Sequence, residues 1–87
     1  MIYQVPTEWT KISFQKDPNI NNIIEWCYTI MGAGKIITYT YFSPGDVYSI
    51  ESTDIENPLW ILEKDINFTV ISFKEKQHAF LFTMRWL

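Results

Sequence analysis

The chain has 87 residues, of which 47% are hydrophobic and 17% aromatic, and it carries a formal net charge of −3. This length predicts a single globular domain, residues 1–87, and the apolar content excludes a disordered chain. Binding of nucleic acid through phosphate neutralisation needs a basic face, so the negative charge disfavours a nucleic-acid partner.

The first regular elements predicted are a strand and a helix. Residues 9–14 alternate between polar and apolar side chains, which is typical of a half-buried strand. Residues 17–18 are Asp and Pro, a capping residue followed by one that loses no hydrogen bond at the first helical position. Apolar side chains then repeat at helical spacing, and Gly32 and Gly34 supply a stop. The pattern therefore predicts a helix over 18–31. Its apolar stripe consists of Ile20, Ile23, Ile24, Cys27 and Met31.

The middle of the chain predicts a hairpin. Residues 35–42 are β-branched and aromatic, which favours a strand. Residues 43–46 contain Pro and Gly at the central positions of a β-turn, which favours type II. Residues 47–51 would return as the second strand. Both faces of 35–42 lean apolar, so we expect an interior strand or a strand with one face used for binding.

The last third predicts two further strands and a helix. After a polar loop over 52–58, the short apolar run 59–62 and the run 66–73 are expected strands, and residues 78–86 an expected helix. The order strand, helix, strands, helix predicts an α+β fold. We expect a small antiparallel or mixed β-sheet with the two helices packed on one face.

The predicted last helix carries more apolar surface than one core contact requires. Ala79, Phe82 and Trp86 share one face, whereas Phe80 and Met84 lie about 100° and 140° around the helix from Ala79. A surface helix normally has a polar back. Either the helix is sandwiched between the sheet and the first helix, or its outer side meets another chain. Phe80 and Met84 are therefore candidate partner-binding residues.

Residues 46–65 form an acidic block, with six acidic side chains and one basic one. Asp46, Glu51, Asp54 and Glu56 are its candidate partner-binding residues, suited to a basic protein surface. The alternative is a solvated loop. Asp54 and Glu56 are close enough in sequence to attempt acid–base or magnesium chemistry, yet they fall in a predicted surface loop.

The sequence offers few groups for catalysis. Metal sites need clustered ligands and nucleophilic catalysis needs a converging base, whereas this chain has one cysteine, Cys27, and one histidine, His78. We expect His78 to be a helix-surface side chain. The sequence predicts no enzyme, no cofactor and no metal site. The single cysteine and the lack of a leader or a long apolar run predict a soluble cytoplasmic protein without membrane contact.

The C-terminal segment also carries a resemblance. Residues 71–86, ISFKEKQHAFLFTMRW, run from an aromatic strand through a short charged turn to a helix that ends on Arg85 and Trp86. Together with residues 25–27, Glu-Trp-Cys, and the following Gly32, this pattern resembles small uncharacterised accessory proteins of large lytic tailed phages. The resemblance implies a viral accessory protein acting in the host cytoplasm, and it implies no catalytic residues.

The lack of catalytic motifs, the acidic block and the surplus apolar surface together predict a non-enzymatic binding protein. With the phage resemblance, we expect it to engage, and to inhibit, a host defence or nucleic-acid-processing protein, or to bind a viral protein. Two alternatives stay open. One is a single-stranded nucleic-acid module that uses Tyr39 and Tyr41 as a stacking platform on the sheet. The other is a self-assembling structural subunit, a homo-oligomer.

Overall fold

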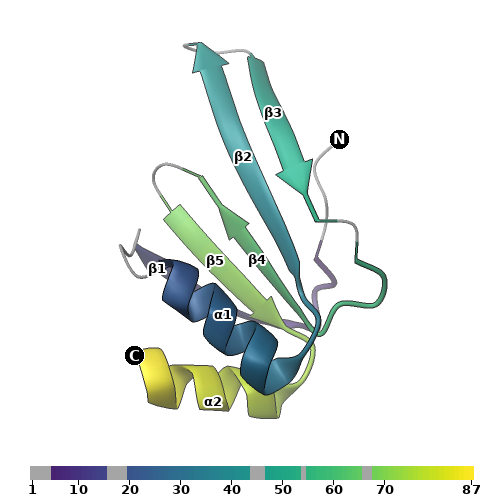
Figure 1. The fold of residues 1–87 in the computed structure, drawn as a ribbon, viewed down its shortest axis with the longest axis vertical. Coiled ribbons are helices and arrows are strands. Elements are labelled where there is room, and N and C mark those ends of the chain that lie inside the picture. Colours follow the sequence, from purple (N-terminus) through teal and green to yellow (C-terminus); the bar gives the residue numbers. More distant parts are fainter. Residues whose placement is uncertain (1–4, 16–19, 44–46, 54, 66–67) are drawn as a thin grey trace.

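The computed structural model describes residues 5–15, 20–43, 47–53, 55–65 and 68–87. It is an α+β fold built from one small mixed sheet and two helices, as predicted. In chain order the elements are β1 (Thr10–Gln15), α1 (Ile20–Met31), β2 (Lys35–Ser43), β3 (Val47–Ser52), β4 (Trp60–Lys64), β5 (Phe68–Phe73) and α2 (Lys76–Trp86) (Figure 1). The predicted helix start at 17–18 and the centre of the predicted turn at 43–46 lie outside the described residues.

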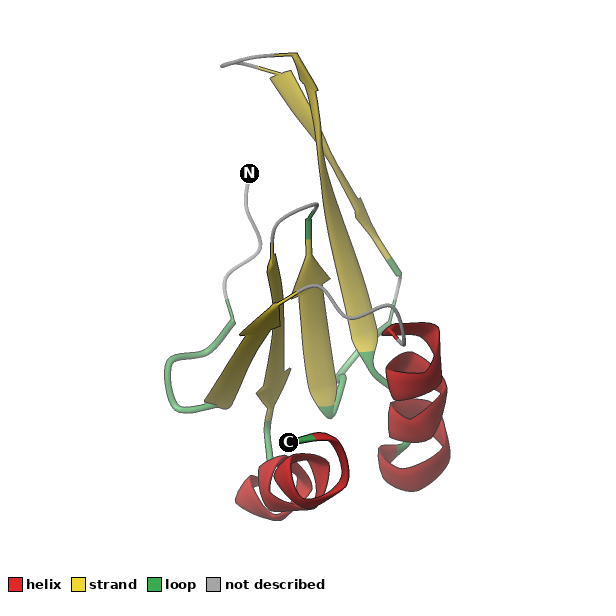
Figure 2. Ribbon diagram, turned by 90° about the vertical axis from the view of Figure 1, so that its left-hand side faces the viewer, coloured by secondary structure: helices red, strands yellow, loops and turns green. Residues whose placement is uncertain are grey.

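The five strands are arranged in the order β1-β5-β4-β2-β3. Three neighbouring pairs are antiparallel, and β2 pairs with β4 in parallel, which makes the sheet mixed. The parallel pairing runs only from Lys35 opposite Ile61 to Thr38 opposite Lys64. Beyond Thr38, β2 pairs with β3 alone, so a two-stranded hairpin extends past the other strands (Figures 1 and 2).

Both helices pack on one face of the sheet and share one hydrophobic core. Strand residues alternate between faces, so Trp60 and Leu62 of β4 point to the helices and Ile61 points to the opposite face. Phe82 of α2 and Cys27 of α1 are fully buried in the helix-side core. Burial of a side chain as large as that of Phe82 contributes about 1.5–3 kcal/mol to the free energy of unfolding. The helix-side core comprises Ile23, Cys27, Met31, Trp60, Leu62, Ile71, Phe73, Ala79 and Phe82.

The opposite face of the sheet has a smaller core, which neither helix of the described chain covers. Ile37 and Tyr39 of β2 pack there with Ile61, and the segment before β1 covers them through Val5 and Trp9. Tyr39 is 8% exposed, and its hydroxyl donates a hydrogen bond of 2.9 Å to Glu63 Oε2. The N-terminal segment of the described chain therefore covers the part of this face around Ile37, Tyr39 and Ile61.

The end of α1 depends on two glycines. Gly32 has φ +95°, in the left-handed region that glycine adopts without a Cβ penalty, so it ends the helix as predicted. Trp60 then anchors the turn, because its Nε1 donates to the Gly32 carbonyl at 3.0 Å. A side chain at Gly34 would overlap the Trp60 indole. The close approach of backbone and indole fixes where α1 meets the sheet.

Candidate functional site

Helix α2 has one buried face and one exposed face. Ala79 and Phe82 are buried against β1 and β5, whereas Phe80 is 64% and Met84 72% exposed. The alternative in which the helix is sandwiched between the sheet and α1 is therefore wrong. The helix also begins at Lys76, two residues before the predicted start.

Three exposed apolar side chains of α2, together with Leu87 at its C-terminal end, lie on one side of the helix. Phe80, Met84 and Leu87 follow the i, i+4, i+7 spacing of one helical face, and Leu81 adjoins them. Leu87 is 70% and Leu81 44% exposed. We call these four residues the outer face of α2. Exposed Lys76 and Arg85 lie near its two ends, so its rim is cationic.

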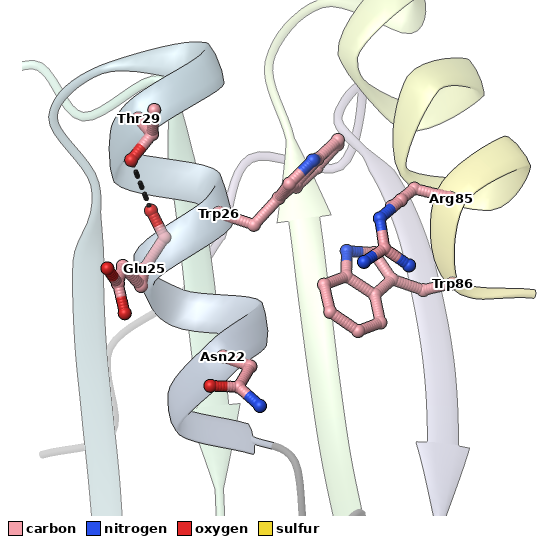
Figure 3. A pocket seen from close by; sticks show the side chains of 6 residues that line it. All are labelled: Asn22, Glu25, Trp26, Thr29, Arg85 and Trp86. Carbon is pink, nitrogen blue, oxygen red and sulfur yellow. Dashed lines mark hydrogen bonds between the residues drawn. The ribbon is translucent and has the colours of Figure 1, made fainter.

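A hollow of about 480 Å³ lies between α1 and α2, and we call it the interhelical pocket (Figure 3). A volume of this size falls within the range of ligand pockets, roughly 300–1,000 Å³. One wall is the polar side of α1 and the other is the C-terminal turn of α2. Its lining residues are Asn22, Glu25, Trp26, Thr29, Arg85 and Trp86.

Two indoles form the aromatic part of the interhelical pocket. The rings of Trp26 and Trp86 meet edge to face, with centroids 6.2 Å apart and planes at 88°. Trp26 also meets Phe82 edge to face at 6.2 Å. Since Phe82 is fully buried in the core, this contact holds Trp26 in place. The aromatic part of the pocket is thus attached to the rigid core.

Arg85 lies across the face of the neighbouring indole. Its guanidinium carbon is 4.2 Å from the centroid of the Trp86 ring, a cation–π contact (Figure 3). No carboxylate forms an ion pair with Arg85 within the described part of the chain. Trp86 Nε1 is buried and has no hydrogen-bond partner among the described residues. The α2 side of the pocket therefore presents a planar cation without an ion pair in the described chain, while the indole N–H of Trp86 is closed off from solvent.

The α1 side of the interhelical pocket is polar. Thr29 Oγ1 donates to the Glu25 carbonyl at 2.9 Å, a bond within the helix. The Glu25 carboxylate is exposed and points away from Trp26 (Figure 3). Glu25 and Arg85 line the same pocket without pairing with each other, so charges of both signs lie at its rim.

The predicted acidic candidates lie elsewhere. Glu51 on β3 and Glu56 before β4 are both exposed, while Asp46 and Asp54 lie outside the described residues. Strand β3 is one edge of the sheet, whereas α2 contacts β5 and the opposite edge strand β1. The structure therefore does not bring Glu51 together with Phe80 and Met84.

Tyr39 and His78 differ from their expected roles, whereas Cys27 is buried in the core as the apolar stripe predicts. Tyr39 is buried and hydrogen-bonded, so it is not free to stack on a base, and the Tyr41 side chain lies outside the described part of the chain. His78 is half-buried, and its Nδ1 is buried with no partner among the described residues, so it is not a simple surface side chain. Burial raises the pKa of Cys27 from 9.0 to about 12, which keeps its thiol protonated and unreactive.

Within the described part of the chain, no three His, Cys, Asp or Glu side chains gather where they could hold a metal ion. None of the helices formed by the described residues is long and apolar enough to cross a bilayer. Compared with protein-family models, with curated proteins and with solved structures, the chain shows no match.

Sequence reasoning missed the interhelical pocket. The helical pattern places Trp26 at the flank of the α1 stripe and Trp86 on the core face of α2, so both read as packing residues. A signal was present in the tryptophan at the border between the apolar and polar sides of α1, since a large ring there must reach toward a neighbouring element. Which element it reaches is decided by the packing of the two helices.

Proposed function

We propose that this protein is a non-enzymatic protein-binding module whose contact surface is the outer face of α2. The exposure of Phe80 and Met84 on the side opposite the core carries this proposal. Contiguous apolar side chains that face water mark interaction sites in soluble proteins. Their i, i+4, i+7 spacing is the pattern with which a helix inserts into an apolar groove of a partner.

The charge around the outer face favours a different protein over a second copy. Residues 74–87 carry three basic side chains and one acidic one. Two copies that paired through α2 would bring like charges together, which opposes association. A partner groove with an acidic rim would gain from the same charges. The resemblance to phage accessory proteins adds a host protein, and its inhibition, as the expected context.

Affinity capture with mass spectrometry tests the proposal. The variant carries Phe80→Gln and Met84→Gln, which remove the apolar anchors and keep good helix propensity. The matched control is Ile30→Gln, another exposed apolar residue but on α1, at 52% exposure. We expect a specific partner to be retained by the wild-type protein and the control, and lost by the double variant. Equal capture by all three would reject the outer face as the contact surface.

Two further measurements test the other parts of the prediction. Glu51→Gln with Glu56→Gln removes the described exposed carboxylates of the acidic block. Unchanged capture by this variant would exclude these carboxylates from the partner interface.

Light scattering over a range of concentrations tests the self-assembling alternative, for which the mass would rise with concentration. A constant monomer mass is expected if the partner is a different protein.

A further inference from the structure

The interhelical pocket suggests what kind of group the partner inserts beside the outer face of α2. The pocket holds an exposed guanidinium, that of Arg85, laid flat on the Trp86 ring 4.2 Å from its centroid and without an ion pair in the described chain. The Trp86 ring beneath it is held by its edge-to-face contact with Trp26, with the two centroids 6.2 Å apart. A guanidinium that lies on a ring and has no ion pair favours an anionic acceptor.

The geometry narrows the choice among anions. A planar guanidinium forms two parallel hydrogen bonds to a carboxylate, and stacking on a ring holds its plane in position. Phosphate carries nearly two charges and is usually bound by several cations, whereas Arg85 is the single basic side chain among the described residues that line this pocket. Glu25 on the opposite wall repels an anion and thereby directs it to the α2 side.

The side chains around Arg85 indicate whether the carboxylate belongs to a protein segment or to a small free anion. Leu81 lies one helical turn before Arg85 on α2 and is 44% exposed, and it adjoins Met84 of the outer face. A ligand that reached Arg85 from the outer face would therefore pass over apolar side chains. An acidic residue within an apolar protein segment would reach Arg85 and also cover these apolar side chains. A small free anion would leave them exposed to water.

We propose that the interhelical pocket binds the side-chain carboxylate of an aspartate or glutamate from the partner. The carboxylate pairs with Arg85, while neighbouring apolar residues of the same segment cover Leu81 and Met84. This proposal rests on the proposed protein-binding function and specifies the chemistry of the partner segment.

Peptide titrations test the pocket directly. The probes are a short capped peptide with one glutamate between leucines, its glutamine analogue, and sodium acetate. The readouts are tryptophan fluorescence and the indole N–H resonance of Trp86 in a nitrogen–proton correlation spectrum, assigned with Trp86→Phe. We expect the glutamate peptide to shift this resonance and to bind at least about tenfold more tightly than the glutamine analogue. Equal binding of the two peptides, or no binding of either, would overturn the proposal.

Variants separate the pocket from the outer face. Arg85→Gln should abolish the preference for glutamate, and Arg85→Lys should weaken it, because an ammonium cannot form the planar pair. Phe80→Gln with Met84→Gln should weaken both peptides and leave the preference intact. Tighter binding of acetate than of the glutamate peptide would reject a protein segment as the ligand. Loss of partner capture in the Phe80 and Met84 variant tests the proposed function independently of this preference.

Discussion

Cys27 lies at the centre of the contact between α1 and the sheet, and its thiol should make stability depend on alkaline pH. The pKa is about 12 in the folded protein against an ordinary value of 9.0. Above pH 9 the unfolded chain loses this proton and the folded one does not, so the free energy of unfolding falls as pH rises from about 9 to 12. At about pH 10.5 the loss should be roughly 2 kcal/mol relative to about pH 8.

Urea unfolding of the wild-type protein and of Cys27→Ala at the two pH values measures this loss. The variant is less stable at both, but it lacks the titrating thiol, so tyrosine and lysine effects cancel in the comparison. The wild-type protein should lose about 2 kcal/mol more than the variant. An equal loss in both proteins would show that the thiol ionises as readily in the folded state as in the unfolded one.

Gly34 is required by the packing of one side chain. An added methyl group would overlap the indole of Trp60, which is fully buried and held by its hydrogen bond to Gly32. Gly34→Ala should therefore lower the free energy of unfolding by roughly 3 kcal/mol, an overpacking effect. The overlap disappears in a Trp60→Leu background, so there the same substitution should cost much less. If both backgrounds respond alike in thermal unfolding, the cost lies in the backbone and not in the indole.

At the scale of one element, the two faces of α2 should respond differently to substitution. Phe80→Gln and Met84→Gln change exposed side chains, so each should leave the free energy of unfolding within about 0.5 kcal/mol of the wild-type value. Phe82→Ala empties a fully buried position and should cost about 3–5 kcal/mol. Urea unfolding compares the three variants. A large loss in either glutamine variant would mean that the outer face stabilises the monomer, and binding tests with it would lose their meaning.

The elements also show what the sequence could and could not predict. Helix α1 is predictable because its apolar spacing and the glycine at Gly32 act locally, and the helix ends where expected. The parallel pairing of β2 with β4 is not, because an alternating pattern carries no information about the neighbouring strand. Strand alternation places Tyr39 on the same face as Ile37, but only the folded chain shows that Val5 and Trp9 pack against them.

In the candidate site, too, features set by local residue spacing are predictable, whereas features set by the packing of two elements are not. The apolar surplus of α2 can be read from residue spacing alone, so Phe80 and Met84 are predictable as exposed positions once Ala79 and Phe82 are assigned to the core. The interhelical pocket depends on the distance between two helices, which neither helical pattern contains. Arg85 is an ordinary basic residue in the sequence, and only the folded chain shows that it lies over the Trp86 ring.

At the scale of the whole molecule, the sheet divides into a covered part and a protruding hairpin. The base of the hairpin is held on both sides. On one side, Lys35–Thr38 pair with β4. On the other, the Thr53 amide donates to the Ile36 carbonyl at 3.1 Å, and the Ile36 amide donates to Thr53 Oγ1 at 3.0 Å. Past Thr38, only β3 pairs with β2, and two-stranded hairpins are marginally stable in water. The far end of the hairpin should therefore open without unfolding the rest.

Hydrogen exchange followed by NMR tests this division. Among hydrogen-bonded amides, protection should be highest near Ile37 and should fall along β2 toward Ser43, because local opening exposes the end of the hairpin first. Strand β5 is the internal control, since β1 and β4 flank it from Thr69 to Phe73 and should keep its protection nearly even. Both helices lie at the other end of the sheet (Figures 1 and 2), so a partner bound at α2 should leave the exchange of the hairpin unchanged. Protection of Tyr41 equal to that of Ile71 would show instead that the sheet opens as one cooperative unit.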